Sequence, residues 1–169
     1  SGDARFRVGM WSMIQNQETL IVPWIEYYLL LGVEHFVLYD NGCSDETSLR
    51  TAPYVERGLV TLIEWNRQTT AFWNMNQMNA MNHFLYKYGE FFEWVGMHDV
   101  DEWLFINDAE QTLPQLLESE HRLYATASAN SKRELGGVAT FCKFFSRQVL
   151  LRARARATVC SHPLNAGAA

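Results

Sequence analysis

The sequence predicts an α/β fold, a Rossmann-like α/β/α sandwich with a mainly parallel central sheet. Strand-like and helix-like segments alternate through the first part of the chain, and such alternation is typical of parallel sheets that carry helices on both faces. The chain has 169 residues, of which 48% are hydrophobic, so it can bury one core but is short for two. We find no internal repeat and no linker, and therefore expect one domain over residues 1–169.

Charge and hydropathy argue against two kinds of partner. Nineteen acidic residues against 14 Lys and Arg give a net charge of -5, which disfavours a nucleic-acid or anionic-membrane surface. The longest apolar stretch, "LIVPWIEYYLLLGV", is interrupted by Pro23 and Glu26 and is shorter than a bilayer core requires, so we expect no transmembrane segment in this chain. Cys43, Cys142 and Cys160 fit one disulfide or a set of free thiols about equally.

The first strand, the first helix and the second strand follow one another closely. Residues 6–13 are rich in β-formers, and residues 35–39 form a short apolar run of the kind that a parallel sheet buries on both faces. Between them, residues 19–32 are apolar on all sides, with Pro23 tolerable in a first helical turn and Gly32 placed as a C-terminal cap. This pattern predicts a helix between two strands.

A second helix and a third strand come next. Ser44 is placed as an N-cap, with Asp45 and Glu46 in a first turn where the helix dipole favours negative charge. The helix should end before Gly58, and the apolar run that follows predicts a strand over residues 59–64.

We expect a third helix over residues 71–89 and a fourth strand over residues 94–98. Several apolar residues recur at the helical period and should face the core: Ala71, Met75, Met78, Met81 or Asn82, Leu85 and Tyr88. Amide side chains form another face, for which solvent exposure is the simpler expectation: Asn74, Asn76, Gln77, Asn79 and Asn82. Gln77, near the helix start, could instead reach a ligand.

The remaining chain is less regular. Residues 108–119 can form a short helix with Thr112 as its cap, and residues 136–146 have the composition of a strand. Residues 149–159 alternate apolar or small residues with arginine, as an edge strand with one basic face would. That face is expected to be solvated, with diphosphate or acceptor binding as the alternative.

The stretch "WVGMHDVDEWLF" places three acids where the fourth strand should end, and ligands of parallel sheets bind beyond that end of the strands. Asp99 and Asp101 would point the same way in extended backbone, and oxygen ligands of this kind suit Mg²⁺ or Mn²⁺ with a diphosphate as third party. The alternative is an ordinary cap or solvated loop. We expect Glu102 to turn away and hold the loop, His98 to orient it, and His162 to be able to complete a metal site.

Two further polar stretches should reach the same edge. "YDNGCSD" follows the second strand, so Asp40, Asn41 and Asp45 could accept hydrogen bonds from a base or a ribose hydroxyl, although Asn-Gly also makes an ordinary turn. "QNQE" ends the first strand and brings Asn16 and Glu18 to that edge. Together with Gln77, these residues are the predicted ligand-binding set.

Taken in order, "QNQETLIVPWIEYYLLLGVEHFVLYDNGCSDET", the amide-containing helix and "WVGMHDVDEWLF" resemble the glycosyltransferases of family 92 and their close relatives in the family 2 group. The similarity covers about residues 5–110, and "GVEHFVLYDN-x-x-SD" and "DVDEWL" are specific in combination. The resemblance implies a GT-A type fold, a nucleotide-sugar donor that is usually UDP-linked, and Mn²⁺ or Mg²⁺ held by the Asp-x-Asp motif. By position, Asp40 would meet the nucleoside, Asp99 would lie near ribose and metal, and Asp101 would ligate the metal.

The chain departs from the family pattern in three places, one of which is Pro23-Trp24 where the family usually has Glu-Trp. The usual Asn-Glu pair after the first strand is here Asn16-Gln17-Glu18. The acceptor-binding half that normally supplies the catalytic base is short after Asp101, and its candidate bases are Asp108, Glu118, Glu120 and Glu134. Glu134 is preferred because it precedes a Gly-Gly turn into a strand. The late His162 lies about where such enzymes supply a histidine to the metal or diphosphate.

The function that this pattern favours is a metal-dependent glycosyltransferase. It would move a sugar, galactose or glucose among the candidates, from a UDP-sugar to a hydroxyl of a glycan or glycoconjugate acceptor with inversion, and Asp101 would be central to catalysis. The alternatives are a noncatalytic nucleotide-sugar or glycan-binding module and another metal-dependent nucleotidyltransferase, although residues 10–20 lack the Gly-rich loop typical of the latter. The compartment stays open: the Golgi lumen if a targeting segment was removed, and the cytoplasm otherwise.

Overall fold

The computed structural model describes residues 6–65, 73–106, 110–127 and 138. The chain separates into two compact units, and each is described by itself. The first spans Ser1–Phe105 and Thr112–Pro114 and contains every strand and three of the α-helices found among the described residues, and the second contains most of a fourth helix. The prediction of one domain over the whole chain stays a prediction.

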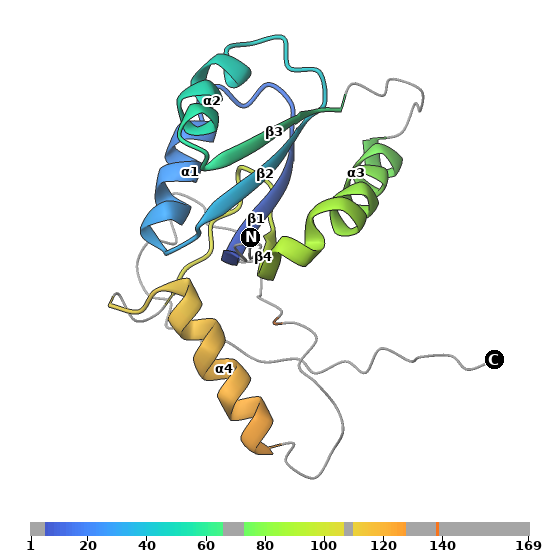
Figure 1. The fold of residues 1–169 in the computed structure, drawn as a ribbon. Coiled ribbons are helices and arrows are strands. Elements are labelled where there is room, and N and C mark those ends of the chain that lie inside the picture. The colour runs from blue at the N-terminus through green and yellow to red at the C-terminus, as the bar shows by residue number, and fades with distance from the viewer. Residues whose placement is uncertain (1–5, 66–72, 107–109, 128–137, 139–169) are drawn as a thin grey trace, which may run out of the picture. The chain divides into compact units, whose positions relative to one another are not determined.

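Four parallel strands form the sheet of the first unit (Figure 1). They are β1 (Phe6–Ile14), β2 (His35–Asp40), β3 (Val60–Glu64) and β4 (Phe92–Met97), in the spatial order β3-β2-β1-β4. Ile14 lies opposite Asp40, and Asp40 lies opposite Glu64, so the carboxyl ends of these strands share one edge. The predicted mainly parallel sheet is confirmed, with β4 beginning two residues earlier than expected, after a short 3-10 turn at Gly89–Phe91.

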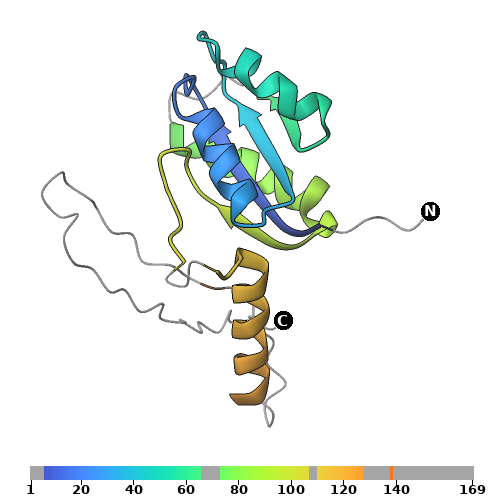
Figure 2. The same cartoon turned by 90° about the vertical axis from the view of Figure 1, so that its left-hand side faces the viewer.

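Helices cover both faces of the sheet (Figures 1 and 2). The helices α1 (Ile21–Leu30) and α2 (Thr47–Glu56) lie on one face, and α3 (Trp73–Tyr88) lies on the other. On the first face, the rings of Trp24 and Phe36 pack with their centroids 5.5 Å apart. The α/β/α sandwich is therefore as predicted.

The core under α3 is formed by residues other than those expected. The helix buries Ala80 and Phe84 in a cluster with side chains of β1 and β2, whereas the exposed fractions of Met75 and Met78 are 52% and 64% and that of Leu85 is 53%. The predicted core stripe on α3 is thus wrong at these three residues, whereas Met81 and Tyr88 pack against the cluster as expected. Ala80 and Phe84 lie one helical turn apart and so belong to the same, buried face of α3.

The ends of α1 and α2 follow from glycine. Gly32 and Gly58 have φ of 93° and 71°, which residues with a Cβ rarely adopt. In each case the glycine N–H and the next N–H bond back to helix carbonyls, as from Val33 to Tyr28 at 2.9 Å and from Leu59 to Tyr54 at 2.9 Å. The predicted cap at Gly32 and the predicted helix end before Gly58 are both confirmed.

The predicted N-cap of α2 is wrong. The helix begins at Thr47, and the N–H and hydroxyl of Ser44 instead donate to Asn16. Asp45 and Glu46 therefore precede the helix rather than forming its first turn, and the Asp45 carboxylate accepts the N–H of Thr47 at 3.0 Å. Ser44 therefore does not cap the helix but links the loop after β2 to Asn16, which follows the end of β1.

The fourth helix, α4 (Leu113–Ala127), begins directly after Thr112 as expected and runs farther than the predicted end at residue 119. The strands expected over residues 136–146 and 149–159 lie outside the described residues, apart from residue 138. Among the helices that the structure describes, none is long and apolar enough to cross a membrane.

Candidate functional site

The loops after β1 and β2 are joined into one hydrogen-bonded unit, which we call the braced loops (residues 15–20 and 41–47). Asn16 has a left-handed backbone with φ of 53°, an uncommon conformation that asparagine tolerates better than most residues. Its Oδ1 accepts hydrogen bonds from the N–H of Ser44 at 2.8 Å and from its hydroxyl at 3.3 Å. The N–H of Asn16 donates to Cys43 Sγ at 3.3 Å. Asn16 therefore ties the end of β1 to the loop after β2.

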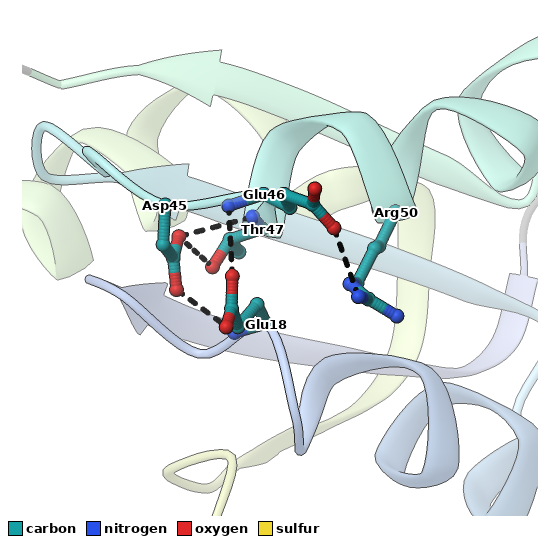
Figure 3. A network of polar contacts seen from close by, with 5 residues as sticks. All are labelled: Glu18, Asp45, Glu46, Thr47 and Arg50. Carbon is teal, nitrogen blue, oxygen red and sulfur yellow. Dashed lines mark hydrogen bonds and ion pairs between the residues drawn. The ribbon is translucent and has the colours of Figure 1, made fainter.

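Carboxylates of the braced loops accept backbone hydrogen bonds across the junction (Figure 3). The N–H of Glu18 donates to Asp45 Oδ2 at 3.1 Å, and the N–H of Glu46 donates to Glu18 Oε2 at 3.1 Å. The Thr47 hydroxyl donates to Asp45 Oδ1 at 2.5 Å, and Arg50 pairs with Glu46 at 2.9 Å. Glu18 and Asp45, both predicted to bind the ligand, are thus engaged within the loops, and a ligand role for them stays a prediction.

Asp40 ends β2, and both of its carboxylate oxygens are occupied. Oδ1 accepts the N–H of Cys43 at 2.8 Å, and Oδ2 accepts the hydroxyl of Ser48 at 2.8 Å. Partial burial acts to raise the pKa of Asp40, but these hydrogen bonds to the ionised form outweigh it and hold the pKa below its ordinary value. Burial and the neighbouring Asp40 raise the pKa of the Cys43 thiol to about 11, so this cysteine stays protonated at neutral pH.

The three acids that follow β4 lie in a tight turn, which we call the acidic turn (residues 98–102). The N–H of Glu102 donates to the carbonyl of Asp99 at 2.9 Å, and the N–H of Asp99 donates to Glu102 Oε2 at 3.1 Å. His98 Nδ1 lies 3.6 Å from the same Glu102 oxygen, and Val100 is buried. Glu102 therefore holds the turn, as expected, with His98 beside it.

Aromatic side chains of α1 hold the backbone just beyond the acidic turn. Trp24 Nε1 and the Tyr28 hydroxyl each donate to the carbonyl of Glu102 at 3.2 Å. The Tyr28 oxygen also accepts the N–H of Leu104 at 3.0 Å, and the Tyr27 hydroxyl donates to the carbonyl of Leu104 at 2.6 Å. Burial raises the pKa of Tyr28 to about 12, so it remains a neutral hydrogen-bonding group. The backbone of the turn is thus fixed from the first helix of the fold.

The carboxylates of Asp99 and Asp101 are available in a way that those of the braced loops are not. Both side chains are exposed, and among the described residues Asp101 has no polar partner. Partial burial and the negative charges of Glu102 and Asp101 raise the pKa of Asp99. Within the part of the chain that the structure describes, no three His, Cys, Asp or Glu side chains are grouped to hold a metal ion by themselves. A cation here would need ligands from outside these residues.

Neighbouring residues of α3 touch both regions. Asn76 Nδ2 donates to Asn41 Oδ1 at 2.6 Å, and Gln77 Nε2 lies 3.4 Å from Asp99 Oδ1. Asn76 is only 7% exposed, so the expectation that it lies in solvent is wrong, whereas Asn79 is exposed as expected. The structure therefore brings Asn41 and Asp99 to the same end of one helix.

Three residues of the site were not predicted from the sequence, and two predicted site residues lie outside the described part of the chain. These unpredicted residues are Asn76, Trp24 and Tyr28. Trp24 and Tyr28 lie one helical turn apart, and each has a polar group that needs a partner when buried, so their spacing could have indicated a shared hydrogen-bonding role. Glu134 and His162 lie outside the described residues, so their predicted roles stay predictions.

Comparisons with known proteins give one consistent result. The family model of glycosyltransferase family 92 matches residues 8–135. A protein of Oryza sativa subsp. japonica named as a glycosyltransferase family 92 protein is 31% identical over 136 residues, which are 79% of this chain and 20% of that protein. An Arabidopsis thaliana protein with the same family name is 32% identical over 108 residues, 61% of this chain and 17% of that protein. The chain thus spans about a fifth of the length of these relatives.

Proposed function

The chain belongs to glycosyltransferase family 92, as its motifs predict, and we propose that it forms the donor-binding part of a metal-dependent glycosyltransferase. The donor is a UDP-sugar, with galactose or glucose as the transferred sugar, and the acceptor is a hydroxyl of a glycan or glycoconjugate. The observation that carries the proposal is the acidic turn. Its backbone is fixed by α1, while the carboxylates of Asp99 and Asp101 stay exposed at the sheet edge where ligands of parallel sheets bind.

The residues of the acidic turn fit a divalent cation that is shared with a diphosphate. Mg²⁺ and Mn²⁺ favour oxygen ligands, and Mg²⁺ is usually held by one or two carboxylates together with substrate phosphates and water. The turn offers two carboxylates, and partial burial together with the negative charges of Glu102 and Asp101 raises the pKa of Asp99. We propose that Asp101 ligates the metal, that Asp99 binds metal or ribose beside it, and that His162 adds a ligand. When bound, the metal would supply positive charge to the diphosphate leaving group.

The nucleoside would lie on the side of the braced loops. Asn41 follows β2 at the same end of α3 as Asp99, because successive residues of that helix contact the two. Since both carboxylate oxygens of Asp40 already accept hydrogen bonds, Asn41 is better placed to contact the nucleoside, and its Nδ2 group can donate to a base or ribose oxygen. Gln77 can hold Asp99 or reach the ligand from the helix.

The chain's own residues would act by position and by charge. The rigid turn keeps Asp99 and Asp101 in place before the donor arrives, which lowers the cost of ordering them on binding. Transfer with inversion also requires a base that takes the proton from the acceptor hydroxyl on the face opposite the leaving group. We propose Glu134 for this role.

Asp101→Asn tests the proposal. Calorimetric titration with UDP in Mn²⁺ should show affinity reduced by more than about 100-fold, because even residues that only orient metal ligands contribute about 10- to 100-fold. The midpoint of thermal unfolding without metal should change little, since Asp101 has no polar partner among the described residues. Glu93→Gln is the matched control, because it neutralises an exposed carboxylate within β4 itself and should leave UDP affinity unchanged.

Other outcomes separate the alternatives. Equal UDP affinity in wild type and Asp101→Asn would contradict the metal site, and the acidic turn would then only end a strand. Metal-dependent UDP binding without release of sugar from any UDP-sugar, tested with the full-length protein, would favour a noncatalytic nucleotide-sugar-binding module. Turnover of a nucleoside triphosphate with a sugar phosphate would favour a nucleotidyltransferase.

A further inference from the structure

Asn76 differs from the other described amides of α3. Its side chain is 7% exposed, whereas Asn79 and Asn82 on the same helix are exposed. A buried amide is unfavourable unless it is hydrogen-bonded, and Asn76 Nδ2 donates to Asn41 Oδ1 at 2.6 Å. The helix therefore directs the Asn76 side chain inward, where it contacts Asn41 of the proposed donor site.

The rest of Asn41 is already fixed. Its N–H donates to the carbonyl of Ile14 at 2.9 Å, and its carbonyl accepts Gln15 Nε2 at 3.2 Å. Only the side chain is left to change orientation, and the bond from Asn76 fixes the side-chain oxygen. In this orientation the Nδ2 group of Asn41 is the remaining donor, and it has no partner among the described residues.

The element that carries Asn76 is itself anchored. Ala80 and Phe84 of α3 are fully buried against the sheet, and the Tyr39 hydroxyl lies 2.8 Å from His83 Nδ1. Tyr39 belongs to β2, the strand that ends directly before Asn41. The helix and the loop that Asn76 connects are therefore held by the same strand, so the Asn76–Asn41 bond has a rigid support.

We infer that Asn76 is a positioning residue, which holds the Asn41 amide so that its NH₂ group faces the nucleoside of the donor. This inference rests on the proposed function, because it requires Asn41 to contact a nucleotide. The expected ligand group is a carbonyl or hydroxyl oxygen of a nucleoside diphosphate, since an N–H donor pairs with oxygen. A side chain that is ordered beforehand binds about two- to twelve-fold more tightly than one that must be ordered on binding.

A double-mutant cycle tests whether Asn76 acts through Asn41. Affinity for UDP in Mn²⁺ is measured by calorimetry for wild type, Asn76→Ala, Asn41→Ala and the double variant. We expect each single variant to bind several-fold more weakly, and the double variant to bind no more weakly than Asn41→Ala. Asn79→Ala, which removes an exposed amide from the same helix, is the control and should bind like wild type.

The cycle distinguishes positioning from a general structural effect. If Asn76→Ala weakens binding by the same factor in the Asn41→Ala background, it acts on the whole fold and the inference is overturned. Unchanged binding by Asn76→Ala overturns it as well. Asn76→Ser, too short to reach Asn41 but still polar, replaces the alanine variant if that one does not fold. A wild type that binds no UDP would overturn the proposed function and this inference together, whereas UDP binding insensitive to Asn76 overturns only the inference.

Discussion

The braced loops and the acidic turn lie at the ends of neighbouring strands, but they use their carboxylates in opposite ways. Glu18 and Asp45 of the braced loops, and Asp40 at the end of β2 beside them, accept hydrogen bonds from backbone or hydroxyl groups of the loops and of α2. In the acidic turn, α1 holds the backbone, while Asp99 and Asp101 stay exposed. The presence of acids at a sheet edge therefore does not locate a cation site. What distinguishes the acidic turn is that the Asp101 carboxylate has no polar partner among the described residues, while that of Asp99 accepts one long hydrogen bond, from Gln77 at 3.4 Å.

The pKa values of Asp40, beside the braced loops, and of Asp99, in the acidic turn, shift in opposite directions because only Asp40 has enough hydrogen bonds to its ionised form to outweigh burial. Hydrogen bonds stabilise the ionised form of Asp40 and lower its pKa despite partial burial, whereas burial and neighbouring negative charge raise the pKa of Asp99. Ionised Asp40 thus stabilises the fold, and ionised Asp99 opposes it. A bound cation would make ionised Asp99 stabilising instead of destabilising. A binding site can therefore reduce stability while it is empty.

The largest effect on stability is expected from Thr47→Val in the braced loops. The buried Thr47 hydroxyl accepts the N–H of Gln17 at 2.7 Å and donates to Asp45 at 2.5 Å. Valine keeps the shape but leaves that N–H without its acceptor, so the free energy of unfolding should fall by about 2 to 3 kcal/mol. Urea denaturation measures the change.

Thr51→Val is the matched control for that variant. Thr51 is also buried in α2, but its hydroxyl donates to the carbonyl of Thr47 within the same helix at 2.7 Å, so its loss should cost less than about 1 kcal/mol. Equal losses in the two variants would show that the junction between the loops adds nothing beyond ordinary burial.

The braced loops also show how far local sequence signals reach. The strands, the three helices around the sheet and the glycine ends of α1 and α2 were predictable, because periodicity and left-handed backbone depend on residues close in sequence. The hydrogen bonds that join the two braced loops were not predictable in this way. Asn16 and Ser44 are 28 positions apart and meet only once β1 and β2 are paired, so Ser44 resembled a helix cap in isolation.

On α3, contacts with residues distant in sequence also decide which side chains are buried. The helical period alone predicts that Met75, Met78 and Leu85 face the core, but Ala80 and Phe84 are the residues of α3 that are fully buried, and the face that packs on the sheet depends on residues distant in sequence. The burial of Asn76 is not predictable from nearby residues, because nothing local shows that its amide has a partner on another element. The acidic turn was easier to find, because its three acids lie within four consecutive positions and follow a strand directly.

Tyr28→Phe is expected to reduce stability less than Thr47→Val, but also to weaken UDP binding. The change removes the donor to the carbonyl of Glu102 and the acceptor for the N–H of Leu104. We expect the free energy of unfolding to fall by about 1 to 2 kcal/mol. Because the acidic turn loses part of its support, Mn²⁺-dependent UDP affinity should also fall, which calorimetry would measure.

Tyr54→Phe is the control that separates a loss of stability from a loss of UDP affinity. Tyr54 is buried in α2 and donates to Glu26 at 2.6 Å, so its loss should also reduce stability but leave UDP affinity unchanged. If both tyrosine variants lowered UDP affinity equally, α1 would have no special role in fixing the turn, and the contrast between held backbone and available carboxylates would lose its support.

The smallest expected effect, and the one whose sign is most informative, is that of Asp99→Asn without metal. The pKa of Asp99 is raised above 3.8 in the fold, so between 3.8 and the raised value the folded state binds more protons than the unfolded state, and stability falls as the pH rises through that window. Asparagine should therefore stabilise the protein at pH 7 by up to about 1 kcal/mol, the limit typical of exposed charges.

Asp40→Asn supplies the opposite sign in the same measurement. Its pKa is lowered below 3.8, so its ionised form contributes stability that is present above 3.8 and is lost only as the pH falls through the lowered value. Urea denaturation in EDTA at pH 7 and pH 4 should thus show the gain of Asp99→Asn shrinking toward pH 4, while the loss of Asp40→Asn stays nearly constant. A loss of stability in Asp99→Asn at pH 7 would place Asp99 with the braced carboxylates, because it would mean that the protein itself already satisfies this group.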